Sequence, residues 1–106
     1  MKEGKLLTLA EVKNILEREA KKRELTYEQK LALEHARTFA RISATNANKL
    51  ISELKKLEFI SEAIAYKIAD VLPRHEDDVR AIFAKERYTL EKEDIDKILE
   101  IVGKFL

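Results

Sequence analysis

Apolar residues recur at intervals of three and four along most of the chain, which is the spacing of one face of an α-helix. No stretch shows the strict apolar–polar alternation that is typical of a half-buried strand. Short polar joints divide the pattern into six segments. The sequence therefore predicts an all-α fold, with helices at about residues 9–20, 27–42, 44–57, 62–72, 76–83 and 89–106.

Polar residues mark where several of these helices begin. Thr8 with Glu11, and Thr26 with Gln29, have the spacing of a capping box, in which a hydroxyl and a longer side chain satisfy each other's free N–H groups. Ser61 stands before the fourth segment as a candidate N-cap. These local signals support the predicted helix starts.

The sharpest corner is predicted at Pro73, the only proline in the chain. Ile68 and Leu72 belong to the apolar stripe before it, and Val79 belongs to the stripe after it. Proline lacks an N–H and disfavours helical geometry in the residue before it, so the fourth helix should stop at Leu72. The acidic run at residues 76–78 suits the positive end of a new helix. The region therefore predicts helix, corner and helix around one core.

The first 42 residues carry more apolar surface than two helices can bury between themselves. The helix at 27–42 is apolar on more than one side, which is typical of a helix held between its own domain and a partner. Residues 1–8 are expected either to be an extended segment that adds to another chain's sheet edge or to be a frayed terminus. The predicted partner-binding side chains are Leu6, Leu7, Leu9, Val12, Ile15, Leu16 and Phe39. We therefore divide the chain into a partner-binding portion, residues 1–42, and a helical domain, residues 43–106.

Charge is nearly balanced overall but not along the chain. The formal net charge is +1, which argues against a whole-protein electrostatic grip on nucleic acid. Residues 1–57 hold 13 Lys/Arg and 8 Asp/Glu, whereas residues 58–106 hold 8 and 12. The basic half offers candidate RNA contacts, and a solvated surface with accidental asymmetry explains the same numbers. The candidate RNA-contacting residues are Arg37, Arg41, Lys49, Lys55 and Lys56, of which Lys49 and Lys56 are two helical turns apart.

Catalytic and cofactor chemistry is not indicated. The chain has no cysteine and only two glycines, so thiol chemistry and phosphate-binding glycine loops are absent. His75 and Asp78 are one turn apart, but no further ligand completes a metal site, so we expect no metal and no cofactor. No apolar run approaches the length of a membrane span, and the lack of cysteine fits a cytoplasmic protein.

Two motifs make the sequence recognisable. Residues 67–73 read Lys-Ile-Ala-Asp-Val-Leu-Pro, and residues 77–83 read Asp-Asp-Val-Arg-Ala-Ile-Phe. Upstream, residues 25–29 read Leu-Thr-Tyr-Glu-Gln. Together, in this order and in a chain of this length, they resemble the F-subunit family of archaeal RNA polymerase, the counterpart of the fourth subunit of eukaryotic RNA polymerase II.

The resemblance implies a non-catalytic subunit of DNA-directed RNA polymerase that pairs with the polymerase's E-subunit, called the stalk partner below. It implies an N-terminal portion wrapped along the stalk partner and a C-terminal HRDC-like helical domain. The heterodimer would form a stalk beside the RNA exit path that supports initiation, elongation and termination, with nascent RNA gripped mainly by the stalk partner. The alternative is a free-standing HRDC-like module that binds nucleic acid. The apolar surplus in residues 6–42 and the small net charge favour the polymerase subunit.

Overall fold

The computed structural model describes residues 6–106, and within that range the chain forms six α-helices and no strand. The helices are α1 (Leu9–Ala20), α2 (Tyr27–Phe39), α3 (Ala44–Leu54), α4 (Glu62–Val71), α5 (Glu76–Ile82) and α6 (Lys92–Gly103). The all-α prediction is confirmed. Residues 6–8 have no regular secondary structure, and residues 1–5 of the predicted extended segment lie outside the described residues.

The predicted caps form at the starts of the helices. The Thr8 hydroxyl accepts a hydrogen bond from the Glu11 N–H at 3.2 Å, and the Thr26 hydroxyl accepts one from the Gln29 N–H at 3.1 Å. In both boxes the side chain of the later residue accepts the N–H of the threonine. The Ser61 hydroxyl likewise accepts the N–H of Ile64. Because such caps need only neighbouring residues, they are readable from sequence.

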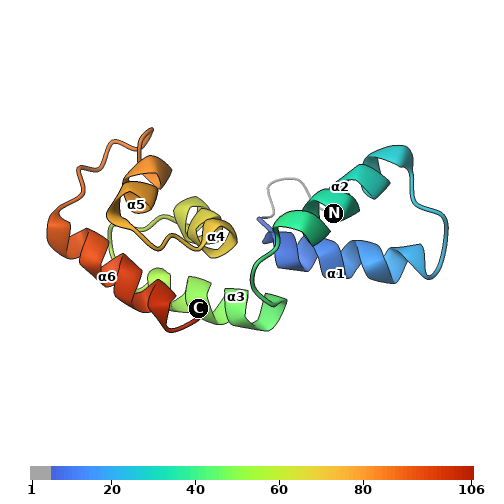
Figure 1. The fold of residues 1–106 in the computed structure, drawn as a ribbon, viewed down its shortest axis with the longest axis horizontal. Coiled ribbons are helices and arrows are strands. Elements are labelled where there is room, and N and C mark those ends of the chain that lie inside the picture. The colour runs from blue at the N-terminus through green and yellow to red at the C-terminus, as the bar shows by residue number, and fades with distance from the viewer. Residues whose placement is uncertain (1–5) are drawn as a thin grey trace.

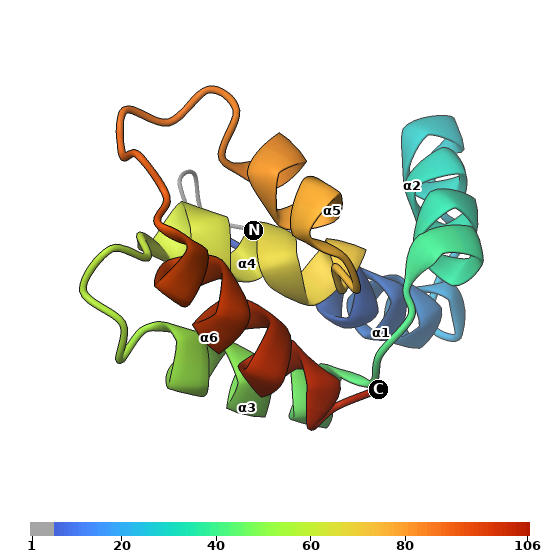
Figure 2. The same ribbon diagram turned by 60° about the vertical axis from the view of Figure 1, so that its left-hand side comes forward.

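The helices gather into two groups along an elongated molecule of 48 × 26 × 22 Å. The hairpin, which we define as α1 and α2 with their loop, lies at one end, and the bundle, which we define as α3 to α6, lies at the other (Figure 1). Within the bundle, α3 packs against α4 and α6, and α5 packs against α4 and α6. Figure 2 shows α2 standing clear of the bundle, while α1 approaches it. The start of the hairpin is the part that contacts α3.

The main hydrophobic core belongs entirely to the bundle. Every residue of the largest buried cluster lies between Ala47 and Val102, and its fully enclosed side chains include Leu50, Leu54 and Ile98. The hairpin contributes only a small buried set, Ala10, Leu25, Leu33 and Ala36. The hairpin therefore has a much smaller hydrophobic core to stabilise it than the bundle has.

The corner at Pro73 has the predicted form. Helix α4 ends at Val71, and Leu72 adopts a left-handed conformation with φ of 52° while its side chain remains buried. Only this non-glycine residue among the described ones has a positive φ, which costs an L-residue about 1–2 kcal/mol. The Asp78 carboxylate accepts the N–H groups of Arg74 and His75 and so caps the start of α5.

Four predicted boundaries are wrong, and one of them is the end of α6, which lies at Gly103 rather than at residue 106. Helix α2 ends at Phe39 rather than near residue 42, because Ala40 is extended and Ile42 packs against the core of the bundle. Helix α3 ends at Leu54 rather than at residue 57. Helix α6 begins at Lys92 rather than at residue 89, because the Asp94 carboxylate accepts the Glu91 N–H and fixes the first turn there.

Candidate partner interface

An apolar groove runs between α1 and α2 on the hairpin. The apolar part of its lining consists of Leu7, Val12, Ile15 and Leu16, from α1 and the segment before it, and of Ala32 from α2. The polar part of the lining consists of Glu19, Arg23, Thr26, Glu28 and Gln29. A surface that combines apolar residues with polar ones is typical of a protein–protein interface. Four of the seven predicted partner-binding residues are thus brought together.

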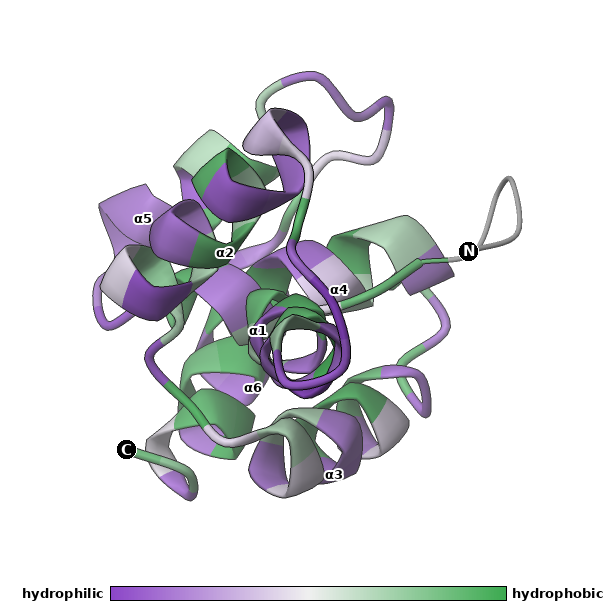
Figure 3. Cartoon of the chain, turned by 90° about the vertical axis from the view of Figure 1, so that its right-hand side faces the viewer, coloured by the Kyte–Doolittle hydropathy of each residue, from purple (hydrophilic) through white to green (hydrophobic). Residues whose placement is uncertain are grey.

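The groove exists because α1 buries its apolar stripe only in part within the chain, with Val12 and Leu16 half-buried. Ala10 is the only buried residue of α1, and Ile15 remains 39% exposed. In a helix of a self-sufficient domain, that stripe would be covered by the rest of the fold. Figure 3 looks at the hairpin from its end and shows hydrophobic segments on its helices as well as on those of the bundle.

Helix α2 presents a second apolar face. Leu33 and Ala36 are buried on the face that packs against α1. Tyr27 and Leu31 are four residues apart, and Phe39 follows Leu31 after eight more; these three side chains lie away from the buried face and are 75%, 49% and 49% exposed. The expectation that α2 is apolar on more than one side is therefore confirmed, and one of these sides is uncovered in the single chain.

The remaining three predicted partner-binding residues do not line the groove. Leu6 is 38% exposed just before Thr8, and Phe39 lies at the end of α2, where its ring is 4.7 Å from that of His35. Leu9 is partly buried at the base of the hairpin, where its N–H donates to Asp70. The role of each in partner binding stays a prediction.

The five candidate RNA-contacting residues fall into two groups. Arg37 pairs with Glu17 across the hairpin at 3.1 Å, and Arg41 donates to the Val71 carbonyl at 3.4 Å, so both have contacts within the chain. Lys49, Lys55 and Lys56 are exposed and take part in no ion pair with another described residue. Because α3 ends at Leu54, Lys56 lies beyond the helix, and the two-turn spacing from Lys49 does not place both on one helical face.

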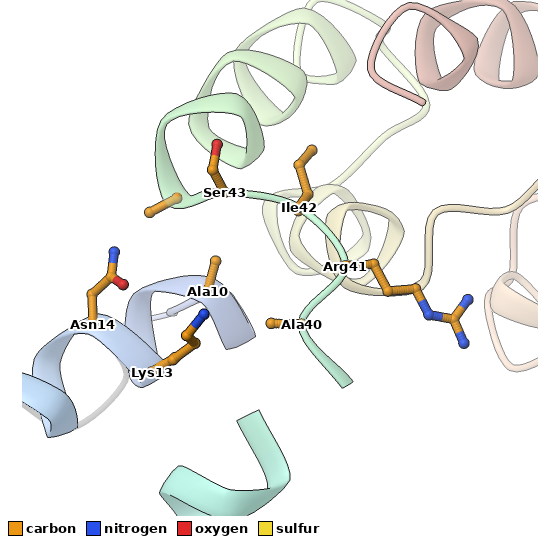
Figure 4. A pocket seen from close by; sticks show the side chains of 8 residues that line it. Ala10, Lys13, Asn14, Ala40, Arg41, Ile42 and Ser43 are labelled. Atoms are coloured by element: carbon orange, nitrogen blue, oxygen red, sulfur yellow. The ribbon is translucent and has the colours of Figure 1, made fainter. Parts of the chain in front are cut away.

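A second, more polar hollow lies where the hairpin meets the start of α3. Ala10, Lys13 and Asn14 of α1 line it on one side, and residues of the linker between α2 and α3 (residues 40–43), among them Ala40, Ile42 and Ser43, line it on the other (Figure 4). The Arg41 side chain points away from this hollow, toward α4. Two side chains of the linker, Arg41 and Ile42, therefore contact the bundle.

Sequence reasoning missed Asp70, which joins the two groups of helices. Its carboxylate Oδ1 accepts the Leu9 N–H at 2.8 Å, although 61 residues separate the two. Burial raises the pKa of Asp70 above its ordinary value of 3.8, the Leu9 hydrogen bond opposes this, and the negative charge of Glu11 adds to it. Burial, with the charges of Glu11 and Glu62, also raises the pKa of Tyr66 on α4. No local sequence signal marks such a long-range pair.

Among residues 6–106, no cluster of three His, Cys, Asp or Glu side chains could hold a metal ion. The candidate pair His75 and Asp78 is instead joined through the backbone, because the His75 N–H donates to the Asp78 carboxylate at 3.2 Å. No helix in the same range is long and apolar enough to cross a membrane.

Comparison with known proteins agrees with the resemblance carried by the two motifs. The family profile of RNA polymerase Rpb4 matches residues 6–106, which is the whole described range. The chain is also 41% identical over 100 residues to the DNA-directed RNA polymerase subunit Rpo4 of Methanocaldococcus jannaschii. That match covers 94% of this chain and 84% of the relative.

Proposed function

The chain belongs to the RNA polymerase Rpb4 family and is a non-catalytic polymerase subunit, and from this premise we propose that it binds the stalk partner as a heterodimer to form the polymerase stalk. In this role the chain contributes no catalytic group. It supports initiation, elongation and termination in the cytoplasm by holding the stalk together near the RNA exit path.

The observation that supports this proposal most is the uncovered apolar surface of the hairpin. The groove lined by Val12, Ile15 and Leu16 and the outer face of α2 both lie outside the core of the bundle. Full burial of one such side chain is worth about 1.5–3 kcal/mol before the costs of ordering. Several of them buried together supply enough free energy to hold a stable complex.

The proposed division of labour follows the helix groups. Residues 1–42 dock on the stalk partner, and residues 43–106 form an HRDC-like domain whose core is complete without it. The bundle then projects from the stalk partner as a preformed unit. This arrangement explains why the uncovered apolar residues gather in the hairpin: of the eight large exposed ones in the described chain, five lie at residues 6–39.

We assign the chain a scaffolding role with respect to RNA. Two of the five candidate cations are engaged within the chain, and the net charge of +1 offers little electrostatic attraction. A free-standing nucleic-acid-binding module would need more unengaged positive charge along one path. The stalk partner is therefore proposed to hold the transcript.

Co-expression with the stalk partner of the same organism tests the proposal. We expect a 1:1 complex on sizing and a melting temperature above that of the chain alone, because a ligand that binds only the native state stabilises it. The chain alone should self-associate at high concentration through the uncovered hairpin. The proposal would be overturned if the chain is a cooperatively folded monomer whose melting temperature does not change when the stalk partner is added.

A further inference from the structure

The start of α1 packs against α3, and Ile42 packs against the core of the bundle, whereas the hydrogen bonds between the hairpin and the bundle gather at one small place. Among residues 6–106, two hydrogen bonds connect residues 6–41 with α3 to α6, and both end on the last turn of α4. The Leu9 N–H donates to Asp70 Oδ1 at 2.8 Å, and Arg41 Nη1 donates to the Val71 carbonyl at 3.4 Å. No ion pair crosses this junction within the described chain. The two donors stand at the beginning of α1 and just after the end of α2.

Asp70 is placed for this contact rather than for its own helix. A carboxylate near the C-terminus of a helix is opposed by the helix dipole, so Asp70 is unfavourable for α4. The same carboxylate faces the positive start of α1, where the Leu9 N–H has no partner inside the helix. The Thr8 hydroxyl accepts the Glu11 N–H beside it, so the two oxygens together cap the first turn of α1.

The contact of Arg41 is also one between a charged side chain and a helix end, but here the side chain is a cation and the helix end is the negative C-terminus of α4. The last carbonyls of a helix lack partners within it and favour a nearby cation. Helix α4 has no basic residue in its last turn. Arg41, from the linker between α2 and α3, supplies the missing cation at the Val71 carbonyl. The C-terminal end of α4 thus contacts both ends of the hairpin. The Asp70 carboxylate binds the positive start of α1, and the Arg41 cation binds the last free carbonyl of α4.

The turn that carries these acceptors is held rigidly by buried side chains. Leu72 is buried with its backbone in the left-handed region, and the Pro73 side chain is fully enclosed. The ring of Pro73 fixes its own φ. Leu72, which precedes it, is held in place by its buried side chain. The acceptors on Asp70 and Val71 therefore have little freedom to follow the hairpin if it moves.

We propose that residues 70–73 are a clamp that fixes the orientation of the hairpin on the bundle, with Asp70 and Arg41 as its two positioning residues. The Asp70 contact fixes the start of α1, and the Arg41 contact fixes the end of the hairpin. With both points held, the hairpin keeps one angle to the bundle; with either released, it swings about the other. The clamp operates whether or not a partner is bound.

Distance measurement between spin labels tests the clamp in the full-length chain. The chain has no cysteine, so Glu34→Cys on α2 and Glu100→Cys on α6, both exposed, provide unique labelling sites. We expect one narrow distance distribution in the otherwise unchanged protein. Asp70→Ala should replace it with a broad one and speed exchange of the Leu9 amide hydrogen about tenfold or more. Arg41→Ala, which removes the donor to the Val71 carbonyl, should broaden it as well.

Two variants keep the test interpretable. Asp70→Asn retains an oxygen that can accept the Leu9 N–H and should keep the narrow distribution. Asp96→Ala removes an exposed carboxylate on α6 and should change nothing. Circular dichroism and amide spectra of α3 to α6 establish that the bundle stays folded in each variant. An unchanged distribution in Asp70→Ala with a folded bundle, or equal broadening in Asp96→Ala, would overturn the clamp.

Discussion

Ile68→Ala should strongly destabilise the bundle. Ile68 is fully enclosed in the core cluster on α4, one turn before the corner at Pro73. Truncating it removes buried methyl groups and leaves a cavity between helices that the corner holds in place, at a cost of about 2–5 kcal/mol. Small domains have only about 5–15 kcal/mol of stability in total. Each kcal/mol lowers the melting temperature of a domain this size by about 4–8 °C.

Val71→Ala is the matched control for this change. Val71 lies on the same helix three residues later, but its side chain is 39% exposed and outside the core cluster. Its truncation should cost less than about 1 kcal/mol, because little additional apolar surface is lost from the interior. Urea titrations with equal slopes give both free energies of unfolding. If Ile68→Ala and Val71→Ala unfold at the same urea concentration, the core does not lie between α4 and its neighbours, and the corner does not have the role described above.

Two further predictions concern charge. The raised pKa of Asp70 means that the native state binds its proton more readily than the unfolded state does. The stability of the wild type relative to Asp70→Asn should therefore rise as the pH falls through that raised pKa toward 3.8, and stay flat at higher pH. Parallel urea titrations across acid pH measure it, and the opposite slope would show that the Leu9 hydrogen bond outweighs burial. Reversing the charges of Lys49, Lys55 and Lys56 in the complex with the stalk partner should leave RNA crosslinking and its salt dependence unchanged. A clear loss of crosslinking would assign the chain a direct RNA contact.

The elements that sequence predicts well here depend on neighbouring residues. The capping boxes at Thr8 and Thr26 and the stop before Pro73 involve partners within four positions, and all three are present in the structure. The end of α2 was missed because Ile42 continues the helical pattern. Its place in the core of the bundle, a tertiary contact, draws the chain out of the helix after Phe39.

The candidate interface shows the same limit. The helical stripe of α1 predicts Val12, Ile15 and Leu16 as a group, and they do line one groove, together with Leu7 from the segment before the helix. Asp70 was not foreseen because its partner is far away in sequence and an acidic residue near a helix end looks like ordinary surface. Arg37 and Arg41 were grouped with the lysines by charge alone, whereas the fold gives each a contact within the chain.

The dissociation constant for the stalk partner, measured for Ile15→Ala beside Val71→Ala, tests the central claim most directly. Both side chains are 39% exposed in the single chain, one in the hairpin groove and one on the bundle. We predict that Ile15→Ala weakens binding about tenfold, as expected from losing about 1–2 kcal/mol of apolar burial, whereas Val71→Ala binds like the wild type. Equal dissociation constants for the two variants would contradict the assignment of the groove as the partner-binding surface.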